Sequence, residues 1–303
     1  MPNEPTNGVV GRSRETELVV AALAARRHVV LEGPPGTGKS TLLRSVAESF
    51  GVSFVFVEGN AELTPSRLIG NFDPARVLDE GYAPSSFVDG PLVQALREGS
   101  LLYVEEINRI PEETLNVLVT VMSEGEITIP RYGVVKAGDG FRLVAAMNPF
   151  DAVGTARISS AIADRVCRVA MTYQSPEDEV AIVHHAIRTA VSGLDAGWIR
   201  GVVEVARATR THPELRTGSS VRGAIDTVLV ASQLVTMRGS TSSVNECGKD
   251  AAIVSLSGRV RLREGATRST EAIIEELWDQ QFASATEAPA GKASAPTGAH
   301  NNR

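Results

Sequence analysis

One loop in the sequence has the residue types needed to hold phosphate. Residues 33–40, Gly-Pro-Pro-Gly-Thr-Gly-Lys-Ser, fit the pattern G-x-x-x-x-G-K-[ST] between a β-rich run, His28–Glu32, and a helical pattern, Lys39–Phe50. The glycines let backbone N–H groups converge on one anion, and the helix start adds partial positive charge. We therefore predict a nucleoside triphosphate site, with Lys39 facing the β- and γ-phosphates and Ser40 facing Mg²⁺.

Two neighbouring acids end a second apolar run. Leu101–Glu105 is predicted to be a strand, and Glu106 follows it directly. Because side chains alternate along a strand, the two carboxylates should point in opposite directions. One carboxylate can then face a metal ion while the other faces an attacking water. We predict that Glu105 holds Mg²⁺, partly through water, and that Glu106 is the base. Two exposed acids at a strand end are the alternative.

The elements that must position these residues alternate between strand and helix up to about Ala170. The expected strands are short and mostly apolar: His28–Glu32, Ser53–Glu58, Leu101–Glu105, Phe141–Met147 and Val166–Met171. The expected helices are Arg14–Arg26, Lys39–Phe50, Pro91–Arg97, Pro111–Ser123 and Ser159–Asp164. Buried strands separated by helices predict a doubly wound α/β sheet that binds ligands at the carboxyl ends of its strands.

Helical patterns dominate after Tyr173. They cover residues 175–191, 198–209, 219–238, 249–256 and 270–282. We therefore predict an α/β nucleotide-binding domain over 9–173 and a small all-helical domain over 174–283. Residues 1–8 would be an N-terminal extension. Residues 284–303 contain no large apolar side chain, so a disordered tail is expected there.

Composition argues against several classes of protein. Hydrophobic residues make up 43% and charged residues 22%, which is typical of globular chains. The formal net charge of −6 argues against a nucleic-acid binder, which usually has a strongly basic surface. For the alternating arginines of 259–263 we therefore favour a solvated or partner-facing edge over a nucleic-acid contact. Cys167 and Cys247 have no partner at metal-ligand spacing and are expected to be small buried hydrophobes. We expect a cytoplasmic protein without membrane insertion, because neither a leader-like start nor a membrane-length apolar run occurs.

Several further segments, in order along the chain, resemble those of AAA+ ATPases and, within them, the MoxR group of the dynein- and magnesium-chelatase-related clade. They are LIG at 68–70, DGPLVQAL at 89–96, VEEINR at 104–109, TIPRYG at 128–133, AAMNP at 145–149 and GSSVRGAI at 218–225. The resemblance covers about Val9 to Trp278. It implies a P-loop NTPase core whose parallel five-stranded sheet has the order 5-1-4-3-2, followed by a small helical lid.

The same resemblance implies catalytic roles for two residues of the α/β half. Asn148 matches the sensor-1 residue, which would hold the attacking water or the γ-phosphate. A simple turn residue before Pro149 is the alternative. Arg165 matches the arginine finger that such proteins extend into a neighbour's site, where it would stabilise developing charge. A surface ion pair with Asp164 is the rival explanation.

Other roles follow from the resemblance in the same way. Arg222 resembles the sensor-2 arginine of the lid, although Val221 stands where the family usually has proline. Glu105 also departs from the family, which usually has Asp there, and this difference can slow hydrolysis because Mg²⁺ tolerates little distortion. The residues expected to contact ATP are Val10 and Gly11 beside the adenine, and Gly33, Pro35, Gly36, Thr37, Gly38, Lys39, Ser40 and Thr41 around the phosphates.

An arginine acting in a neighbour's site requires a head-to-tail ring, and the resemblance implies a hexamer. The leading hypothesis is an ATPase that remodels or matures a client protein, with a von Willebrand factor A domain protein as partner. The alternatives are a nucleotide-gated switch with little hydrolysis, which Glu105 favours, and, more weakly, a nucleic-acid motor. Two insertions, residues 60–100 and 126–140, the second predicted to be a hairpin, either line the pore of such a ring or only pack the domain.

Overall fold

The computed structural model of the 303-residue chain describes residues 9–51, 53–149, 159–191, 193–239 and 242–283. The expected N-terminal extension and disordered tail lie outside the described residues. The chain divides into two compact units, Met1–Asp178 and Glu179–Arg303, a few residues beyond the boundary expected after Tyr173. No helix in the described residues is long and apolar enough to span a membrane.

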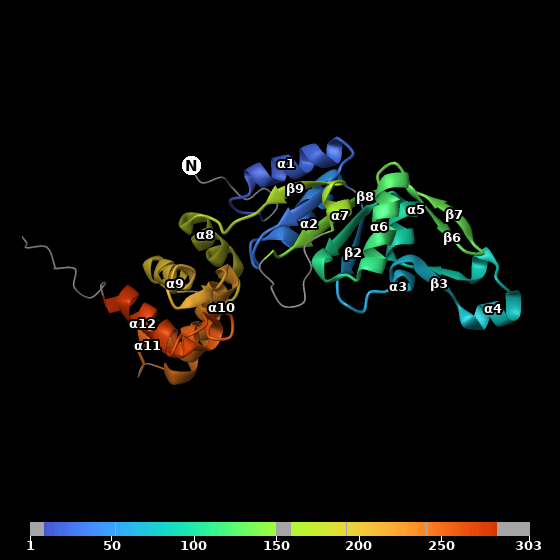
Figure 1. Ribbon diagram of the computed structural model, residues 1–303. Coiled ribbons are helices and arrows are strands. Elements are labelled where there is room, and N and C mark those ends of the chain that lie inside the picture. The colour runs from blue at the N-terminus through green and yellow to red at the C-terminus, as the bar shows by residue number, and fades with distance from the viewer. Residues whose placement is uncertain (1–8, 52, 150–158, 192, 240–241, 284–303) are drawn as a thin grey trace, which may run out of the picture. The chain divides into compact units, whose positions relative to one another are not determined.

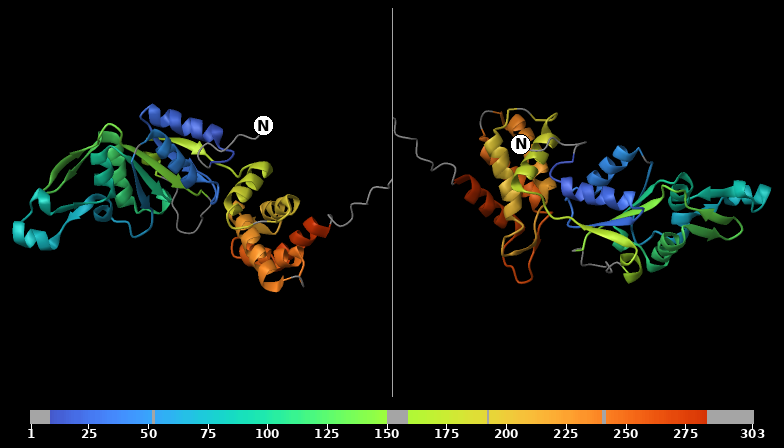
Figure 2. Two further views of the ribbon diagram at one scale, coloured as in Figure 1. Left: turned by 180° about the vertical axis from the view of Figure 1, so that it is seen from behind. Right: turned by 90° about the horizontal axis from the view of Figure 1, so that it is seen from above.

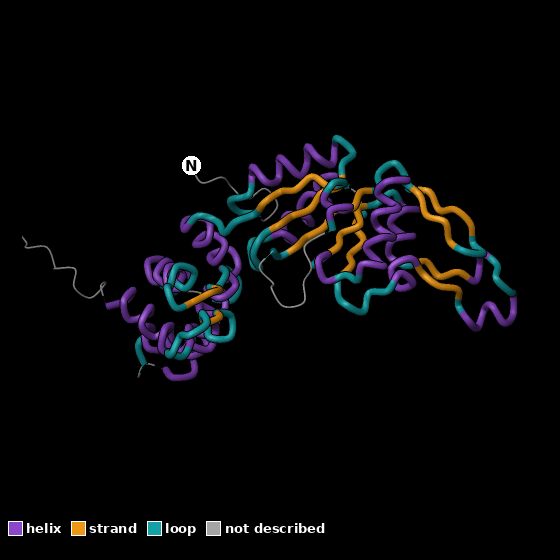
Figure 3. The backbone as a smooth tube through the Cα atoms, viewed as in Figure 1, coloured by secondary structure: helices purple, strands orange, loops and turns teal. Residues whose placement is uncertain are grey.

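A five-stranded parallel sheet forms the centre of the first unit (Figures 1 and 3). Its strands are β1 His28–Glu32, β2 Phe54–Glu58, β5 Leu101–Glu105, β8 Arg142–Met147 and β9 Val166–Ala170. The spatial order is β2-β5-β8-β1-β9, and every neighbouring pair runs parallel. Numbered along the core strands, this is the order 5-1-4-3-2, so the AAA+ sheet expected from the resemblance is confirmed.

Helices cover both faces of this sheet. They are α1 Ser13–Ala24, α2 Lys39–Phe50, α5 Pro91–Glu98, α6 Glu112–Glu124 and the short α7 Ser160–Ala163. Alternate residues of a strand enter different cores. Leu31 and Tyr103 pack with α1 and α2, whereas Leu102 packs with α5 and α6. Burial on both faces explains why the inner strands are continuously apolar rather than alternating.

The two insertions form antiparallel pairs that contact each other. The first contains α3 Pro65–Ile69, β3 Gly70–Phe72, α4 Pro74–Glu80, a 3₁₀ turn at Pro84–Ser86 and β4 Phe87–Asp89; the second contains β6 Glu126–Ile129 and β7 Gly133–Lys136. The predicted hairpin is therefore confirmed. Phe87 joins the two pairs, because its ring centroid lies 5.1 Å from that of Phe72 and 4.8 Å from that of Tyr132. Figure 2 shows both pairs at the same end of the first unit.

The second unit is helical except for one small sheet. Its helices are α8 Pro176–Ile187, which starts at the unit boundary, α9 Ala196–Ala208, α10 Val221–Arg238, α11 Val244–Leu256 and α12 Thr270–Ala283. The expectation of an all-helical domain was wrong in one respect, since β10 Leu215–Thr217 pairs with β11 Arg261–Leu262. Cys247 is buried as expected, whereas Cys167 on strand β9 is exposed.

Helix α11 begins five residues before the predicted Lys249, at Val244. Ser243 accepts a hydrogen bond from the backbone N–H of Glu246, and the Glu246 carboxylate accepts one from the backbone N–H of Ser243. This capping box is visible in the sequence as S-x-x-E, so the start of the helix could have been found there.

Candidate nucleotide-binding site

The loop between β1 and α2 is shaped by its glycines. Gly36 and Gly38 have φ angles of +74° and +84°, in the left-handed region that favours glycine. A Cβ atom on Gly33 would lie 2.2 Å from the carbonyl oxygen of Met171, just past β9. The backbone N–H of Gly33 also donates to the carbonyl of Met147 at the end of β8. The loop is therefore packed against the carboxyl ends of both strands that flank β1.

The side chains of the loop hold it in a compact turn. Lys39 Nζ donates to the carbonyl oxygens of Gly33 and Pro34, at 2.8 and 2.9 Å. The buried Thr37 hydroxyl donates to the same Pro34 oxygen at 2.9 Å. Lys39 is the first residue of α2, and its ammonium group reaches back to the start of the loop. This arrangement offers an incoming anion both a cation and the N-terminal amides of a helix.

Ser40 is the point where the loop meets the acidic strand. Its Oγ donates to Glu105 Oε1 at 2.9 Å and lies 3.1 Å from the hydroxyl oxygen of Tyr103. Burial raises the pKa of the Tyr103 hydroxyl above its ordinary value. The two residues predicted to hold the metal are therefore in contact. Tyr103 was missed, although a hydroxyl inside a continuous apolar strand was the available signal.

Glu106 lies just outside the strand, and strand alternation does not set its direction. Its backbone is left-handed, with φ 53° and ψ 43°, and begins the 3₁₀ turn Ile107–Arg109. Glu106 Oε2 lies 2.9 Å from Arg109 Nη1, an ion pair within this turn. A Cβ atom on Gly59, just past β2, would lie 2.5 Å from the Glu106 carbonyl oxygen. The tight turn, rather than the pleat of β5, therefore orients the candidate base.

The same turn is linked to the end of β8. Buried Asn108 donates through Nδ2 to the backbone carbonyl of Asn148, at a long 3.4 Å. This contact places the candidate sensor-1 residue beside the turn that carries Glu106. Asn148 is half-buried, and the residues from 150 to 158 lie outside the described part of the chain.

Arg12 joins the phosphate loop to the segment just past β9, and the sequence patterns did not indicate this contact. Its side chain is 3% exposed. One terminal nitrogen donates to the carbonyl of Thr37 at 2.9 Å and to that of Thr172 at 2.6 Å, and the other lies 2.6 Å from Glu15 Oε1. The adjacent Val10 and Gly11, predicted to line the adenine pocket, are thereby held close to the loop.

The residues at this site suit Mg²⁺ better than a metal held entirely by protein. Within the described residues, no group of three or more His, Cys, Asp or Glu side chains could hold a metal ion. Mg²⁺ usually keeps several waters and takes only one or two protein oxygens besides phosphate. The hydroxyl of Ser40 and the carboxylate of Glu105 match that requirement.

Comparison with known proteins agrees with this geometry. Residues 28–166 match the AAA domain family, dynein-related subfamily, and this segment contains the phosphate loop and the acids that end β5. These residues form an AAA domain. The chain is 29% identical over 241 residues to the uncharacterized protein YeaC of Bacillus subtilis, covering 72% of each protein. It is 32% identical over 155 residues to the uncharacterized protein SERP0979 of Staphylococcus epidermidis, covering 50% of this chain and 58% of that protein.

Solved structures show that the AAA domain has the AAA+ fold. A candidate ATPase from Cytophaga hutchinsonii matches with a TM-score of 0.50 and 21% identity, covering 89% of this chain and 90% of that one. A Thermotoga maritima RuvB mutant matches with a TM-score of 0.53 and 16% identity, covering 84% and 72% of the two chains. Brucella abortus NtrX, solved with ADP, matches with a TM-score of 0.54 and 19% identity, covering 78% and 53%.

Arg165 lies two residues after the end of α7, outside the phosphate loop. Its Nε donates to the Ser123 hydroxyl at 2.6 Å, and one terminal nitrogen donates to the Ala161 carbonyl at 2.8 Å. These bonds anchor the guanidinium to α6 and α7. The role of Arg165 in a neighbouring site stays a prediction.

Arg222 is an exposed residue of the second unit, next to the first residue of α10. The chain just before α10 is held firmly. The backbone N–H of Ser219 donates to the Thr209 hydroxyl at 2.8 Å, and Arg210 Nε donates to the Ser219 carbonyl at 2.7 Å. A Cβ atom on Gly218 would lie 2.5 Å from Arg210 Cα, so glycine is required for this approach.

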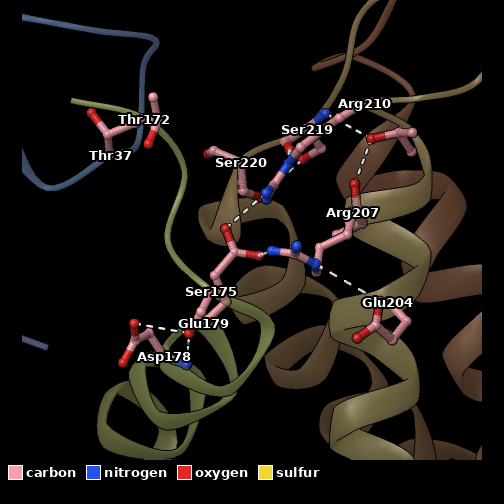
Figure 4. A network of polar contacts seen from close by, with 12 residues as sticks. Thr37, Thr172, Ser175, Asp178, Glu179, Glu204, Arg207, Arg210, Ser219 and Ser220 are labelled. Carbon is pink, nitrogen blue, oxygen red and sulfur yellow. Dashed lines mark hydrogen bonds and ion pairs between the residues drawn. The ribbon is translucent and has the colours of Figure 1, made fainter. Parts of the chain in front are cut away.

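Arg210, which holds the chain just before α10, is itself held by a buried carboxylate. Glu179 on α8 is 1% exposed, and its two oxygens lie 2.8 Å from Arg210 and 3.0 Å from Arg207 (Figure 4). A buried carboxylate needs such partners because burial without them is costly. Within the second unit, the Glu179–Arg210–Ser219 chain of contacts therefore fixes the start of the helix that carries Arg222.

The alternating arginines of 259–263 are also engaged within the second unit. Arg259 lies 2.5 Å from Asp226, and Arg263 donates to the carbonyl of Leu215 at 3.1 Å. These contacts tie the region around β11 to α10 and β10. They support a structural role for the basic edge.

Proposed function

We propose that this chain binds ATP with Mg²⁺ at residues 33–40, hydrolyses it, and uses the cycle to remodel or mature a client protein. The observation that supports this proposal best is the contact of Ser40 with Glu105 directly beside Lys39. It joins a phosphate-binding loop to an acidic strand inside an AAA domain, and such a domain implies nucleotide binding.

Each residue of the site has a role in this proposal. Lys39 exchanges its loop carbonyls for the β- and γ-phosphates, while Ser40 and Glu105 hold the cation. Mg²⁺, when bound, would neutralise charge on the phosphates. Glu106 leaves its ion pair with Arg109 to polarise the attacking water. Asn148 would orient that water or the γ-phosphate.

The remaining residues act from further away in the proposal. Arg165 from a neighbouring copy would stabilise charge on the transferred phosphoryl group, and Arg222 would contact the γ-phosphate. A residue shared in this way requires a head-to-tail contact, which closes into a ring if the rotation between copies allows it. The resemblance to the MoxR group supports a hexamer and a von Willebrand factor A domain partner.

A second function, a nucleotide-gated switch with little hydrolysis, is favoured by two observations. Glu105 stands where the family usually has Asp, and the carboxylate of Glu106 is paired with Arg109. If this pair persists when ATP is bound, the base cannot reach the attacking water. ATP would then change the assembly of the protein without being consumed quickly.

Binding and turnover, measured separately, distinguish the two functions. ATP binding by calorimetry and steady-state phosphate release are measured for wild type, Lys39→Ala and Glu106→Gln. We expect Lys39→Ala to lose binding, and Glu106→Gln to keep ATP, lose turnover and accumulate assembled rings. Glu113→Gln, at an exposed position on α6, is the matched control and should behave as wild type.

The outcomes lead to different conclusions. ATP binding with phosphate release no faster than buffer, in wild type as in Glu106→Gln, establishes the switch and rejects the ATPase. Folded wild type that shows no heat of association with ATP and magnesium rejects both functions.

A further inference from the structure

Tyr103 places a hydroxyl group at the candidate metal site from inside the hydrophobic core. Its residue exposure is 0%, and its ring centroid lies 5.4 Å from that of Phe54 and 5.6 Å from that of Phe56. The strand that carries it is paired on both sides, with Phe56 of β2 and Val144 of β8 as its direct neighbours. The position of this ring is therefore determined by packing, and its hydroxyl oxygen is held 3.1 Å from Ser40 Oγ.

Counting protons gives these contacts a direction. The Ser40 hydroxyl has one proton and two lone pairs, whereas a carboxylate can only accept. The proton of Ser40 is used in the 2.9 Å bond to Glu105 Oε1. The bond between Tyr103 and Ser40 must then be donated by Tyr103. One lone pair of Ser40 Oγ accepts that bond, and one lone pair remains.

We infer that Tyr103 is a positioning residue for Mg²⁺: by donating to Ser40 while Ser40 donates to Glu105, it fixes the serine hydroxyl with one lone pair directed to the cation. The inference rests on the proposed function and deepens it. Glu105 then also orients the serine hydroxyl, in addition to its proposed contact with the cation.

The direct test compares nucleotide binding with and without the metal. Calorimetry gives the Kd of a non-hydrolysable ATP analogue in Mg²⁺ and in EDTA, for wild type and Tyr103→Phe. The phenylalanine keeps the buried ring and removes only the hydroxyl. Loss of a group that orients a metal ligand typically costs about 10- to 100-fold in metal affinity. We therefore expect the tightening produced by Mg²⁺ to fall at least about 10-fold, with the Kd in EDTA unchanged.

Two further variants make the test specific. Tyr132→Phe removes another tyrosine hydroxyl, one that accepts from Arg97 in the hairpin region, and should leave both Kd values unchanged. Ser40→Ala removes the ligand through which Tyr103 acts. Adding Tyr103→Phe to Ser40→Ala should therefore cause no further loss, because coupled residues are not additive. Thermal melting of each variant without nucleotide shows that the fold is retained.

The inference and the proposed function fail in different ways. If Ser40→Ala loses the effect of Mg²⁺ but Tyr103→Phe keeps it, the magnesium site stands and the role of Tyr103 is refuted. Fully additive losses in the double variant refute it as well. If Ser40→Ala retains the wild-type Mg²⁺ effect, the magnesium site of the proposed function is itself wrong, and the inference falls with it.

Discussion

Replacing Arg12 with alanine should destabilise the first unit strongly, even though Arg12 lies outside every sequence motif of the site. The guanidinium is 3% exposed and donates to the carbonyls of Thr37 and Thr172. A hydrogen bond to a charged group contributes roughly 1.5 to 3 kcal/mol. Truncation removes two of them and leaves Glu15 without this cation. We expect a loss of about 3 to 5 kcal/mol in the free energy of unfolding, as for other buried ion pairs from which one partner is removed.

Hydrogen exchange at increasing urea concentrations measures this loss locally. Peptides covering residues 33–40 and 166–173 contain the two segments that Arg12 joins, so their opening free energies should fall together. Arg12→Lys should recover only part of the loss, because an ammonium group lacks the planar fork that serves several acceptors. Nucleotide affinity should fall in the same order, since the phosphate loop is one of the two segments.

Arg168→Ala is the matched control. Arg168 also joins two strands, through an ion pair with Glu32, but its side chain is 60% exposed. Exposed pairs contribute less than about 1 kcal/mol. If Arg12→Ala and Arg168→Ala lower the opening free energy of residues 33–40 by the same small amount, the argument from burial is refuted.

Three further predictions concern pH, helix positioning and assembly. Burial lowers the pKa of His28 to about 4, so the unfolded chain binds more protons than the folded chain below pH 6.5. Wild type should therefore lose up to about 3 kcal/mol of unfolding free energy between pH 6.5 and pH 4. Urea titrations of His28→Asn should not show this loss. Arg210→Lys loses the hydrogen bond to Ser219 and should speed amide exchange in the first turn of α10 about tenfold. If Arg207→Lys speeds this exchange as much as Arg210→Lys does, the role of Arg210 in positioning α10 is contradicted. Arg165→Ala should keep the nucleotide affinity of the isolated subunit and lower ATP turnover by the ring about 10³-fold. Subunit-mixing assays in which the variant subunits do not impair their wild-type neighbours would refute the shared site.

Local patterns were sufficient for most of the first unit. The strands β1 and β5 and the helix α2 have the predicted bounds, because continuous apolar runs and a glycine-rich helix start are local signals. The contact between Ser40 and Glu105 could also be anticipated, since ligands of such sheets gather at the carboxyl ends of the strands. The start of α11 was missed although its capping box is present in the sequence.

Other parts of the site depend on contacts between distant residues. Nothing near Arg12 in the sequence indicates that it bonds to Thr172, 160 positions away. The direction of Glu106 follows from a left-handed turn rather than from strand alternation. Likewise, Glu179 is an ordinary helical acid in the sequence, and only packing buries it between two arginines.

By itself, the sequence determined that a phosphate-binding loop follows the first strand and in which order the elements of the first unit come, because phosphate loops, apolar strands and helix starts are recognised over a few consecutive residues. Only the tertiary structure decided which polar groups form hydrogen bonds with one another, as Tyr103, Ser40 and Glu105 do. The physical reason is that a hydrogen bond depends on distances of about 3 Å, which strand pairing and core packing set between residues far apart in the chain.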